Sequence, residues 1–356
     1  MRKTLMIASA MAATGLAAST LMPARPAFAE DQLTVTSWGG PYQTNVRKAI
    51  FDPFTKATAI KVIENEYGGE VAKVRAMVKT KTVNWDVLDA ETGAGAQMCA
   101  EGLLETIDWK KLGLDRTKFI SSEVHDCGVP TLASGAIVAY DKDKLPNGPK
   151  TIADLFDTKK FPGKRGMWRS PYPNLEWALL ADGVPTKDVY KVLGTPEGVD
   201  RAFKKLDTIK KDIIWWTAGP QPRQLLDAGE AVMSAAWYST IYDAVKNSGK
   251  HFAIMWDAQA FTWNNWVIPK GTPRLDEAYK FLAFAASAQA QAELTRYSPY
   301  GPANKDAMAL VDPTILPDLQ TTPEHMANAL DSEAGTTFWI EKDDELRQRF
   351  NAWLTQ

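Results

Sequence analysis

Short apolar runs alternate along the chain with longer segments whose apolar residues recur every three or four positions. Residues 33–36 (LTVT) are typical of a short strand, and residues 85–89 (WDVLD) of another. Between them, Val71, Val74 and Val78 share one face of an amphipathic helix. Because strands that alternate with helices usually pair in parallel, this pattern predicts a mostly parallel sheet covered by helices.

A second strand–helix series follows a β-rich stretch at residues 131–146. Thr151 and Asp154 have the spacing of a capping box, and Thr195 precedes Pro196 as the N-cap of an amphipathic helix. The chain has no internal repeat and no low-complexity linker. Two interleaved α/β lobes joined by β crossovers therefore fit the pattern better than two domains in series.

The first 29 residues differ from the rest of the chain. Arg2 and Lys3 precede an apolar stretch of small residues, and Ala27-Phe28-Ala29 has the A-x-A form of a cleavage site before Glu30. This is the pattern of a secretory signal peptide, since polar residues interrupt the stretch and make it weakly hydrophobic for a membrane span. We expect residues 1–29 to be removed and the mature protein to reside in the periplasm.

Charge and cysteine content narrow the function classes. The residues after position 29 carry a net charge of about −5 and contain no basic run, which argues against nucleic-acid binding. In an exported protein, Cys99 and Cys127 are expected to form a disulfide, with two unpaired thiols as the alternative. The 13 tryptophans are many for a chain of this length; some must belong to the core, but their number also suggests a ligand held by aromatic surfaces.

Signatures of catalysis are missing from the sequence. Its 3 histidines have no metal-ligand spacing, and there is no H-E-x-x-H, C-x-x-C or G-x-S-x-G motif. Residues 93–98 (GAGAQM) have two glycines of a dinucleotide fingerprint but not the third. We therefore expect no enzyme activity, no metal and no cofactor.

Unusual residues gather in the segments that follow predicted strands. These segments are 37–43 (SWGGPYQ), 88–95 (LDAETGAG), 235–242 (AAWYSTIY) and 260–266 (AFTWNNW). Loops after parallel strands lie at the carboxyl edge of the sheet, where α/β proteins bind ligands. Tryptophan faces bind cations, and carboxylates bind ammonium groups through charge-assisted hydrogen bonds. We expect Trp38 and Tyr42 to form one wall of a ligand cleft.

The order and spacing of these motifs resemble the periplasmic solute-binding proteins of ABC importers, specifically the spermidine/putrescine-binding branch. The motifs that carry the resemblance are LTVTSWGGPYQ, WDVLDAETG, CAEGLLETID, CGVPTLASGAIVAYDKDKLP, TIADLFDTKKFPGKRGMW, LLDAGEAVMSAAWYS, WNNWVIPKGTPRLDEAYKFL and SPYGPANKDA. They span essentially the whole chain after the signal peptide. The resemblance implies a monomer that captures a small molecule between two lobes and docks on an ABC permease in the inner membrane.

The resemblance also implies a type II periplasmic-binding-protein fold, in which each lobe has a mostly parallel sheet flanked by helices. The implied division is residues 30–136 and 266–320 for lobe 1, and 137–265 and 321–356 for lobe 2. The two β crossovers are expected to form the hinge, near residues 134–139 and 262–267.

Carried over position by position, the family's ligand contacts fall on nine residues of this chain. They are Trp38, Tyr42, Glu91, Thr92, Arg169, Ser170, Trp237, Asn264 and Tyr300. Two positions depart from the family pattern. Asn264 stands where the family has a carboxylate, and Arg169 and Ser170 stand where acids grip an amine.

The departures leave two ligand classes open. The family resemblance favours a polyamine such as putrescine or spermidine. An arginine in the cleft instead prefers a carboxylate, so Glu91 and Arg169 together would suit a zwitterion, unless Arg169 is a solvated surface residue. A ferric-ion binder would need clustered tyrosines that the sequence lacks, whereas a receptor-linked binding protein would have the same pocket.

Overall fold

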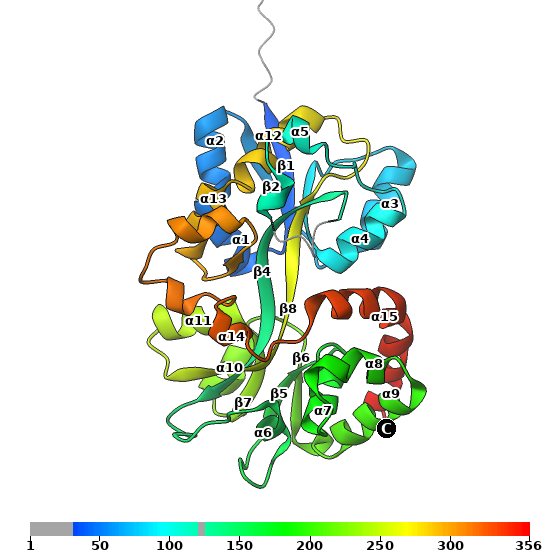
Figure 1. Cartoon of the computed structure of the whole chain (residues 1–356), viewed down its shortest axis with the longest axis vertical. Helices are drawn as coiled ribbons and strands as arrows, with labels where there is room; N and C mark the ends of the chain where they lie inside the picture. Colours follow the sequence, from blue (N-terminus) through cyan, green and yellow to red (C-terminus); the bar gives the residue numbers. More distant parts are fainter. Residues whose placement is uncertain (1–30, 120–124) are drawn as a thin grey trace, which may run out of the picture.

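The computed structural model describes residues 31–119 and 125–356. The predicted signal peptide lies outside these residues. Within them, no helix is both long enough and apolar enough to cross a membrane. The chain forms two α/β lobes, one above the other in Figure 1, connected by two long strands that run through both.

The first lobe is built from both halves of the chain. Its elements are β1 (Gln32–Ser37), α1 (Gly40–Val46), a π-helical turn (Arg47–Phe51), α2 (Asp52–Thr58), β2 (Lys61–Glu66), α3 (Val71–Thr80), β3 (Val87–Glu91), α4 (Thr92–Ala100), α5 (Trp109–Leu112), α12 (Leu275–Ala285), α13 (Ala288–Thr295) and β9 (Gly301–Pro302). The second lobe contains α6 (Ile152–Phe156), β5 (Arg165–Trp168), α7 (Asn174–Ala181), α8 (Val189–Leu193), α9 (Pro196–Asp207), β6 (Ile213–Trp216), α10 (Gln221–Asp227), β7 (Met233–Trp237), α11 (Tyr238–Lys246) and α15 (Ser332–Leu354). The crossing strands are β4 (Gly128–Asp141) and β8 (Phe252–Val267), and α14 (Pro323–Met326) lies on the last connection between the lobes.

The crossing strands merge the two parallel sets into one sheet, in the order β2-β1-β3-β8-β4-β7-β5-β6. Strands β1, β2 and β3 pair in parallel, and so do β5, β6 and β7. Strand β8 pairs antiparallel with β3 and with β4, and β4 pairs antiparallel with β7. The predicted α/β fold with two β crossovers is therefore confirmed, and each lobe has its own apolar core. The residue boundaries of the lobes remain a prediction.

Local signals in the sequence locate several elements correctly. The Asp154 carboxylate accepts a hydrogen bond from the Thr151 backbone, as expected for a capping box, and the Thr195 hydroxyl accepts one from Gly198 at the start of α9. Leu346, Phe350 and Trp353 bury one face of α15, as the period of that segment predicts. The predicted and observed elements agree here because helix capping and hydrophobic periodicity depend only on residues a few positions apart.

The segment after β1 is more helical than its sequence suggests. It reads as a loop from Ser37 to Gln43, but α1 already begins at Gly40. Gly39 has a φ of 69°, and a Cβ there would lie 2.6 Å from the Glu66 carboxylate, so the tight turn into the helix requires glycine. The turn shortens the connection and brings Tyr42 back towards the sheet.

A disulfide joins Cys99 of α4 to Cys127, immediately before β4, as predicted. The bridge spans 28 positions of sequence, so it removes loop-closure entropy from the unfolded chain. Replacing both cysteines with alanine should lower the free energy of unfolding by about 3 kcal/mol. Urea denaturation of the variant and of the oxidised wild-type protein measures the difference, and equal midpoints would contradict the prediction.

Candidate functional site

The carboxyl ends of the parallel strands in the two lobes point towards each other. Strand β8 runs from lobe 2 to lobe 1, and Glu91, at the end of β3, pairs with Asn264, the first of the β8 residues that pair with β3 and therefore the one nearest to lobe 2. Strand β4 runs the opposite way, and Trp237, at the end of β7, pairs with Ala136, the first of the β4 residues that pair with β7 and therefore the one nearest to lobe 1. The segments that follow the parallel strands of both lobes therefore border the space between the lobes.

A buried carboxylate lies at the centre of the lobe 1 edge. Asp89 on β3 is fully buried, and it accepts hydrogen bonds from the Tyr42 hydroxyl at 2.5 Å and from the Asn264 amide at 2.9 Å. Burial raises the pKa of Asp89 to about 6, although these hydrogen bonds and the nearby Trp38 indole favour its charged form. Burial and the neighbouring Asp89 charge raise the pKa of Tyr42 well above its usual value. This cluster fixes two predicted residues, Tyr42 and Asn264, around an anion.

Glu91 lies two positions after Asp89 and therefore on the same face of β3. Its side chain keeps solvent-accessible surface, but the surrounding protein raises its pKa to about 7, and the Asp89 charge adds to the effect. Arg347 of α15 partly offsets this shift. The Glu91 charge in turn contributes to the raised pKa of Tyr172 in lobe 2. Glu91 is thus an accessible acid that faces the opposite lobe.

Aromatic rings and unpaired polar atoms line the rest of the lobe 1 edge. The Trp38 ring packs on Tyr67 with 4.8 Å between centroids, and the Tyr67 hydroxyl donates to the Asp89 carbonyl. The Ser37 hydroxyl is buried without a hydrogen-bond partner among the described residues, whereas the Trp38 indole acts on the Asp89 carboxylate. Buried polar atoms nearly always have partners, so the Ser37 hydroxyl is available to a ligand or to water.

Two further predicted residues serve different purposes. Thr92 is buried, and its hydroxyl is hydrogen-bonded to two residues of β8. It donates to the Trp263 carbonyl at 2.8 Å and accepts from the Asn265 side-chain amide. Thr92 therefore connects α4 to β8 and has little surface for a ligand. Tyr300 is buried beside Tyr42, with 5.8 Å between ring centroids. Burial raises the Tyr300 pKa to about 12, and hydrogen bonding to Ser239 of α11 opposes the shift, which places its hydroxyl next to lobe 2.

Three tryptophans end the three parallel strands of lobe 2. Trp168, Trp216 and Trp237 are the last residues of β5, β6 and β7. Trp168 stacks on Trp216 with 6.1 Å between centroids and meets the edge of Trp237 at 5.2 Å. Trp168 and Trp237 remain partly exposed, so lobe 2 presents an aromatic surface to the aromatic surface of lobe 1. Trp237 lies where the resemblance predicts it.

Arg169 and Ser170 follow β5 directly at this edge. The Arg169 backbone is fixed by a hydrogen bond to the Trp216 carbonyl at 2.9 Å. Its side chain is exposed and makes no ion pair or side-chain hydrogen bond with any part of the chain that the structure describes. The Ser170 hydroxyl is buried and has no partner among the same residues. Lobe 2 thus offers one unpaired cation and one unpaired hydroxyl.

Sequence reasoning missed three residues of this arrangement: Asp89, Tyr67 and Trp168. Asp89 could have been found from the two-residue period of a strand, since it must share a face with Glu91. The sequence gives no comparable signal for Tyr67, whose ring reaches Trp38 only because β1 and β2 pair in register.

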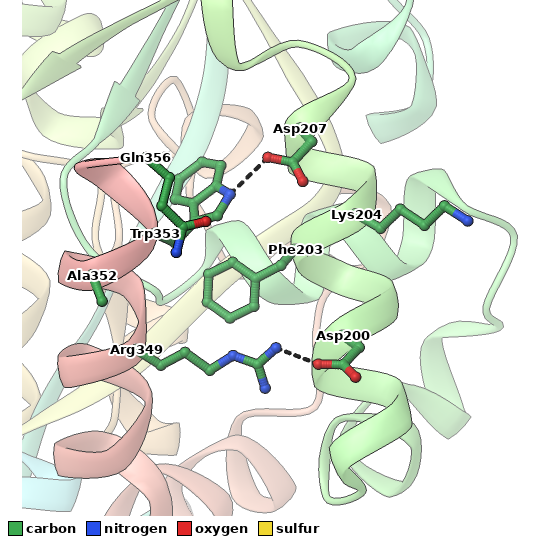
Figure 2. Close-up of a pocket in the computed structure, with 8 residues that line it drawn as sticks. All are labelled: Asp200, Phe203, Lys204, Asp207, Arg349, Ala352, Trp353 and Gln356. Atoms are coloured by element: carbon green, nitrogen blue, oxygen red, sulfur yellow. Dashed lines mark hydrogen bonds and ion pairs between the residues drawn. The ribbon is translucent and has the colours of Figure 1, made fainter.

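The two edges together place charged groups and aromatic rings on both sides of the space between the lobes. This arrangement offers carboxylates on lobe 1, a guanidinium on lobe 2 and aromatic walls on both, which suits a small ligand with charged groups. Among residues 31–119 and 125–356, no group of three or more potential ligands could hold a metal ion. A separate groove between α9 and the end of α15 (Figure 2) contains none of the predicted residues, and its Asp207 and Asp200 already pair with Trp353 and Arg349.

Comparison with known proteins identifies relatives of the chain. It is 43% identical over 326 residues to the γ-aminobutyric acid-binding protein of Pseudomonas aeruginosa, which covers 91% of both chains. It is 22% identical over 301 residues to the spermidine/putrescine-binding periplasmic protein of Salmonella typhimurium, covering 78% of this chain and 80% of the relative. The chain is thus similar to the spermidine/putrescine branch, and it is more similar in sequence to the γ-aminobutyric acid-binding protein.

Solved structures agree with these relatives. The structure of a γ-aminobutyrate (GABA) receptor superposes with a TM-score of 0.79 at 36% identity, covering 91% of this chain and 98% of the receptor. The binding protein AgtB from A. tumefaciens R10, solved with agropinic acid, gives 0.78 at 33% identity over 92% and 99% of the two chains. The sequence profile for bacterial extracellular solute-binding proteins matches residues 49–327. The chain therefore belongs to the bacterial extracellular solute-binding protein family.

Proposed function

We propose that this protein is the periplasmic component of an ABC importer and that it captures a small zwitterion with separated amine and carboxylate groups, of the γ-aminobutyrate type. The observation that carries the proposal is the distribution of charge between the lobes: Glu91 and Asp89 lie at the carboxyl edge of lobe 1, and Arg169, unpaired among the described residues, follows β5 at the carboxyl edge of lobe 2. The relative named for γ-aminobutyric acid supports the same ligand class. The ligand would then pass to a permease in the inner membrane.

The lobe 1 edge suits the amine. Glu91 is accessible, and an approaching ammonium would favour its charged form, because an opposite charge nearby lowers a carboxyl pKa. Trp38 and Tyr67 supply ring faces beside it, which attract cations. Asp89, buried on β3 two positions before Glu91, adds negative charge near this edge without being exposed.

The lobe 2 edge suits the carboxylate. A guanidinium binds a carboxylate through two parallel hydrogen bonds, and no acid pairs with Arg169 within residues 31–119 and 125–356. The unpaired Ser170 hydroxyl could donate a third hydrogen bond. A ligand held at both ends contacts both lobes only when they are closed, so its binding shifts the population towards the closed form.

A diamine fits this arrangement less well. One ammonium would meet Glu91, but the other would lie next to Arg169 and would be buried without an anion, at a cost of several kcal/mol. The polyamine expectation from the family resemblance therefore becomes the alternative. The relative named for spermidine and putrescine is also the more distant one in sequence.

Calorimetric titration of the mature protein tests the proposal. The protein is unfolded and refolded to remove bound solute, then titrated with γ-aminobutyrate, putrescine, spermidine and malate. We expect γ-aminobutyrate to bind at least about 100-fold more tightly than putrescine, the ratio for one unpaired buried charge. Saturation by the diamines alone would establish the polyamine alternative, and no saturation by any compound would overturn solute capture in these classes.

A further inference from the structure

Three chain segments cross between the lobes and meet at one buried point. Two are the crossing strands β4 and β8. The third is the return segment, defined here as residues 319–330, which leads from the Tyr300 region back to α15 of lobe 2 (Figure 1). Two glutamines, Gln259 of β8 and Gln320 of the return segment, lie at the meeting point, and both are fully buried.

The two glutamines bind each other and the backbone around them. The Gln320 amide donates to the Gln259 side-chain oxygen at 3.1 Å. The Gln259 amide donates to the carbonyls of Gln320 at 3.2 Å and His325 at 2.7 Å. The backbone of Gln259 accepts from the Leu330 amide at 2.9 Å, so one residue of β8 holds the return segment at three positions.

Strand β4 packs closely against the same glutamine pair at Gly135. A Cβ at Gly135 would lie 2.5 Å from the Ala260 carbonyl oxygen and 2.7 Å from the Gln320 amide nitrogen. Real Cβ atoms do not approach other atoms so closely, so the close packing of β4 against the glutamine pair requires glycine here. All three crossings are thereby in contact around one side-chain pair.

The pair is also connected to each lobe. On the lobe 1 side, the Gln320 backbone amide donates to the Pro299 carbonyl at 3.1 Å, immediately before Tyr300 of the ligand site. On the lobe 2 side, β8 bulges between Met255 and Ala260, where Ala258 has a φ of 57°. The Trp177 indole of α7 donates to the Ala258 carbonyl at 2.7 Å and anchors that bulge to the lobe 2 core.

We propose that the Gln259–Gln320 pair is the pivot of lobe closure and a positioning element for Tyr300. Its hydrogen bonds and close contacts hold β4, β8 and the return segment together at the same point between the lobes. Bending during closure is therefore confined to the residues of these segments before and after that point. The hydrogen bonds also fix the Pro299–Tyr300 backbone relative to β8, which carries Asn264 of the same site. Neither glutamine touches the ligand. This inference rests on the proposed capture of a small solute.

Ligand titrations of single and double variants test the pivot. Gln320→Leu removes the hydrogen bond between the two side chains and leaves the Gln259 side-chain oxygen without this donor. We expect γ-aminobutyrate to bind about 10-fold more weakly, the effect of one lost net hydrogen bond. Gln259→Leu should act similarly, and the double variant should be no weaker than the worse single variant, because both remove one shared unit.

A matched control separates positioning from stability. The Asn328 amide ties the same return segment to Asp257 of β8 at 3.0 Å, through a hydrogen bond that involves neither glutamine. Asn328→Ala should lower the melting temperature but leave the dissociation constant within about twofold. If Gln320→Leu behaves like Asn328→Ala, the pair is only structural and the proposal is wrong.

Hydrogen exchange of the wild-type protein provides a test that does not depend on variants folding. The Gln320 and Leu330 amides should exchange slowly and at equal rates with and without γ-aminobutyrate, because a pivot keeps its hydrogen bonds in both states. Rapid exchange of either amide in the ligand-free protein would overturn the pivot. Failure of the wild-type protein to bind any solute would instead overturn the proposed function.

Discussion

Replacing Arg169 with glutamine is expected to weaken the binding of γ-aminobutyrate by at least about 100-fold, equivalent to about 2.7 kcal/mol. The ligand carboxylate would lose a charge-assisted, bidentate partner within a closed and largely dehydrated cleft, where truncation of one member of a charge pair costs 2–5 kcal/mol. Stability should change little, because the Arg169 side chain is exposed and has no partner in the described residues. The same substitution should improve putrescine binding, since it removes a cation from the path of the second ammonium.

Calorimetry with both ligands measures the two effects together. Arg169→Lys keeps the charge but not the planar fork, so an intermediate loss is expected. Arg201→Gln is the matched control, because Arg201 lies on lobe 2 but pairs with Asp182 at 2.6 Å. If Arg169→Gln binds γ-aminobutyrate as tightly as the wild type does, Arg169 is a solvated surface residue and the carboxylate must be bound elsewhere.

The location of the candidate site residues at the strand ends could be predicted from the sequence, because it depends on strand order alone. A parallel strand that ends in an aromatic or charged residue places that residue at the carboxyl edge, and Trp38, Glu91 and Trp237 all obey this rule. The antiparallel crossings then orient the two edges towards each other. The pattern of strands and helices already favoured two β crossovers, and the family resemblance added where along the chain they are expected.

Other features depend on contacts between residues far apart in the sequence. Asp89 reads as an ordinary acid after a strand, and its burial exists only because Tyr42 and Asn264 enclose it. Gln259 and Gln320 lie 61 positions apart, and no local pattern marks either as buried. Local propensity specifies elements, whereas packing between lobes decides which polar residues lose their water.

Glu176 of α7 is the clearest case of a polar residue whose burial the sequence does not announce. It lies beneath α15 and is fully buried. One of its oxygens accepts a hydrogen bond from the Trp339 indole at 2.6 Å, while the other has no partner among the described residues. Tyr190 also hydrogen-bonds to the carboxyl group, but no cation faces it in the same part of the structure, so burial raises its pKa to about 8.

The raised pKa predicts that Glu176 makes folding depend on pH. The folded protein holds the proton up to about pH 8, whereas the unfolded chain releases it near the ordinary value of 4.5. The stabilising contribution is therefore complete below about pH 4.5 and is lost as the pH rises through 8, for a total of about 5 kcal/mol. Glu176→Gln keeps a neutral side chain of the same shape and cannot ionise, so it should remove this loss.

Urea denaturation at pH 5, 7 and 9 isolates the effect as the difference between variant and wild type. Asp89 and Glu91 also have raised pKa values, but they titrate in both proteins and cancel in that difference. Glu176→Gln should match the wild type at pH 5 and exceed it by a few kcal/mol at pH 9, while Glu341→Gln, at an exposed position of α15, should give a constant difference. A constant difference for Glu176→Gln as well would mean that α15 lifts or water enters to solvate the carboxylate. Because α15 also contacts α4 of lobe 1, lifting of the helix would loosen a contact between the lobes as well, whereas entry of water alone would leave that contact in place.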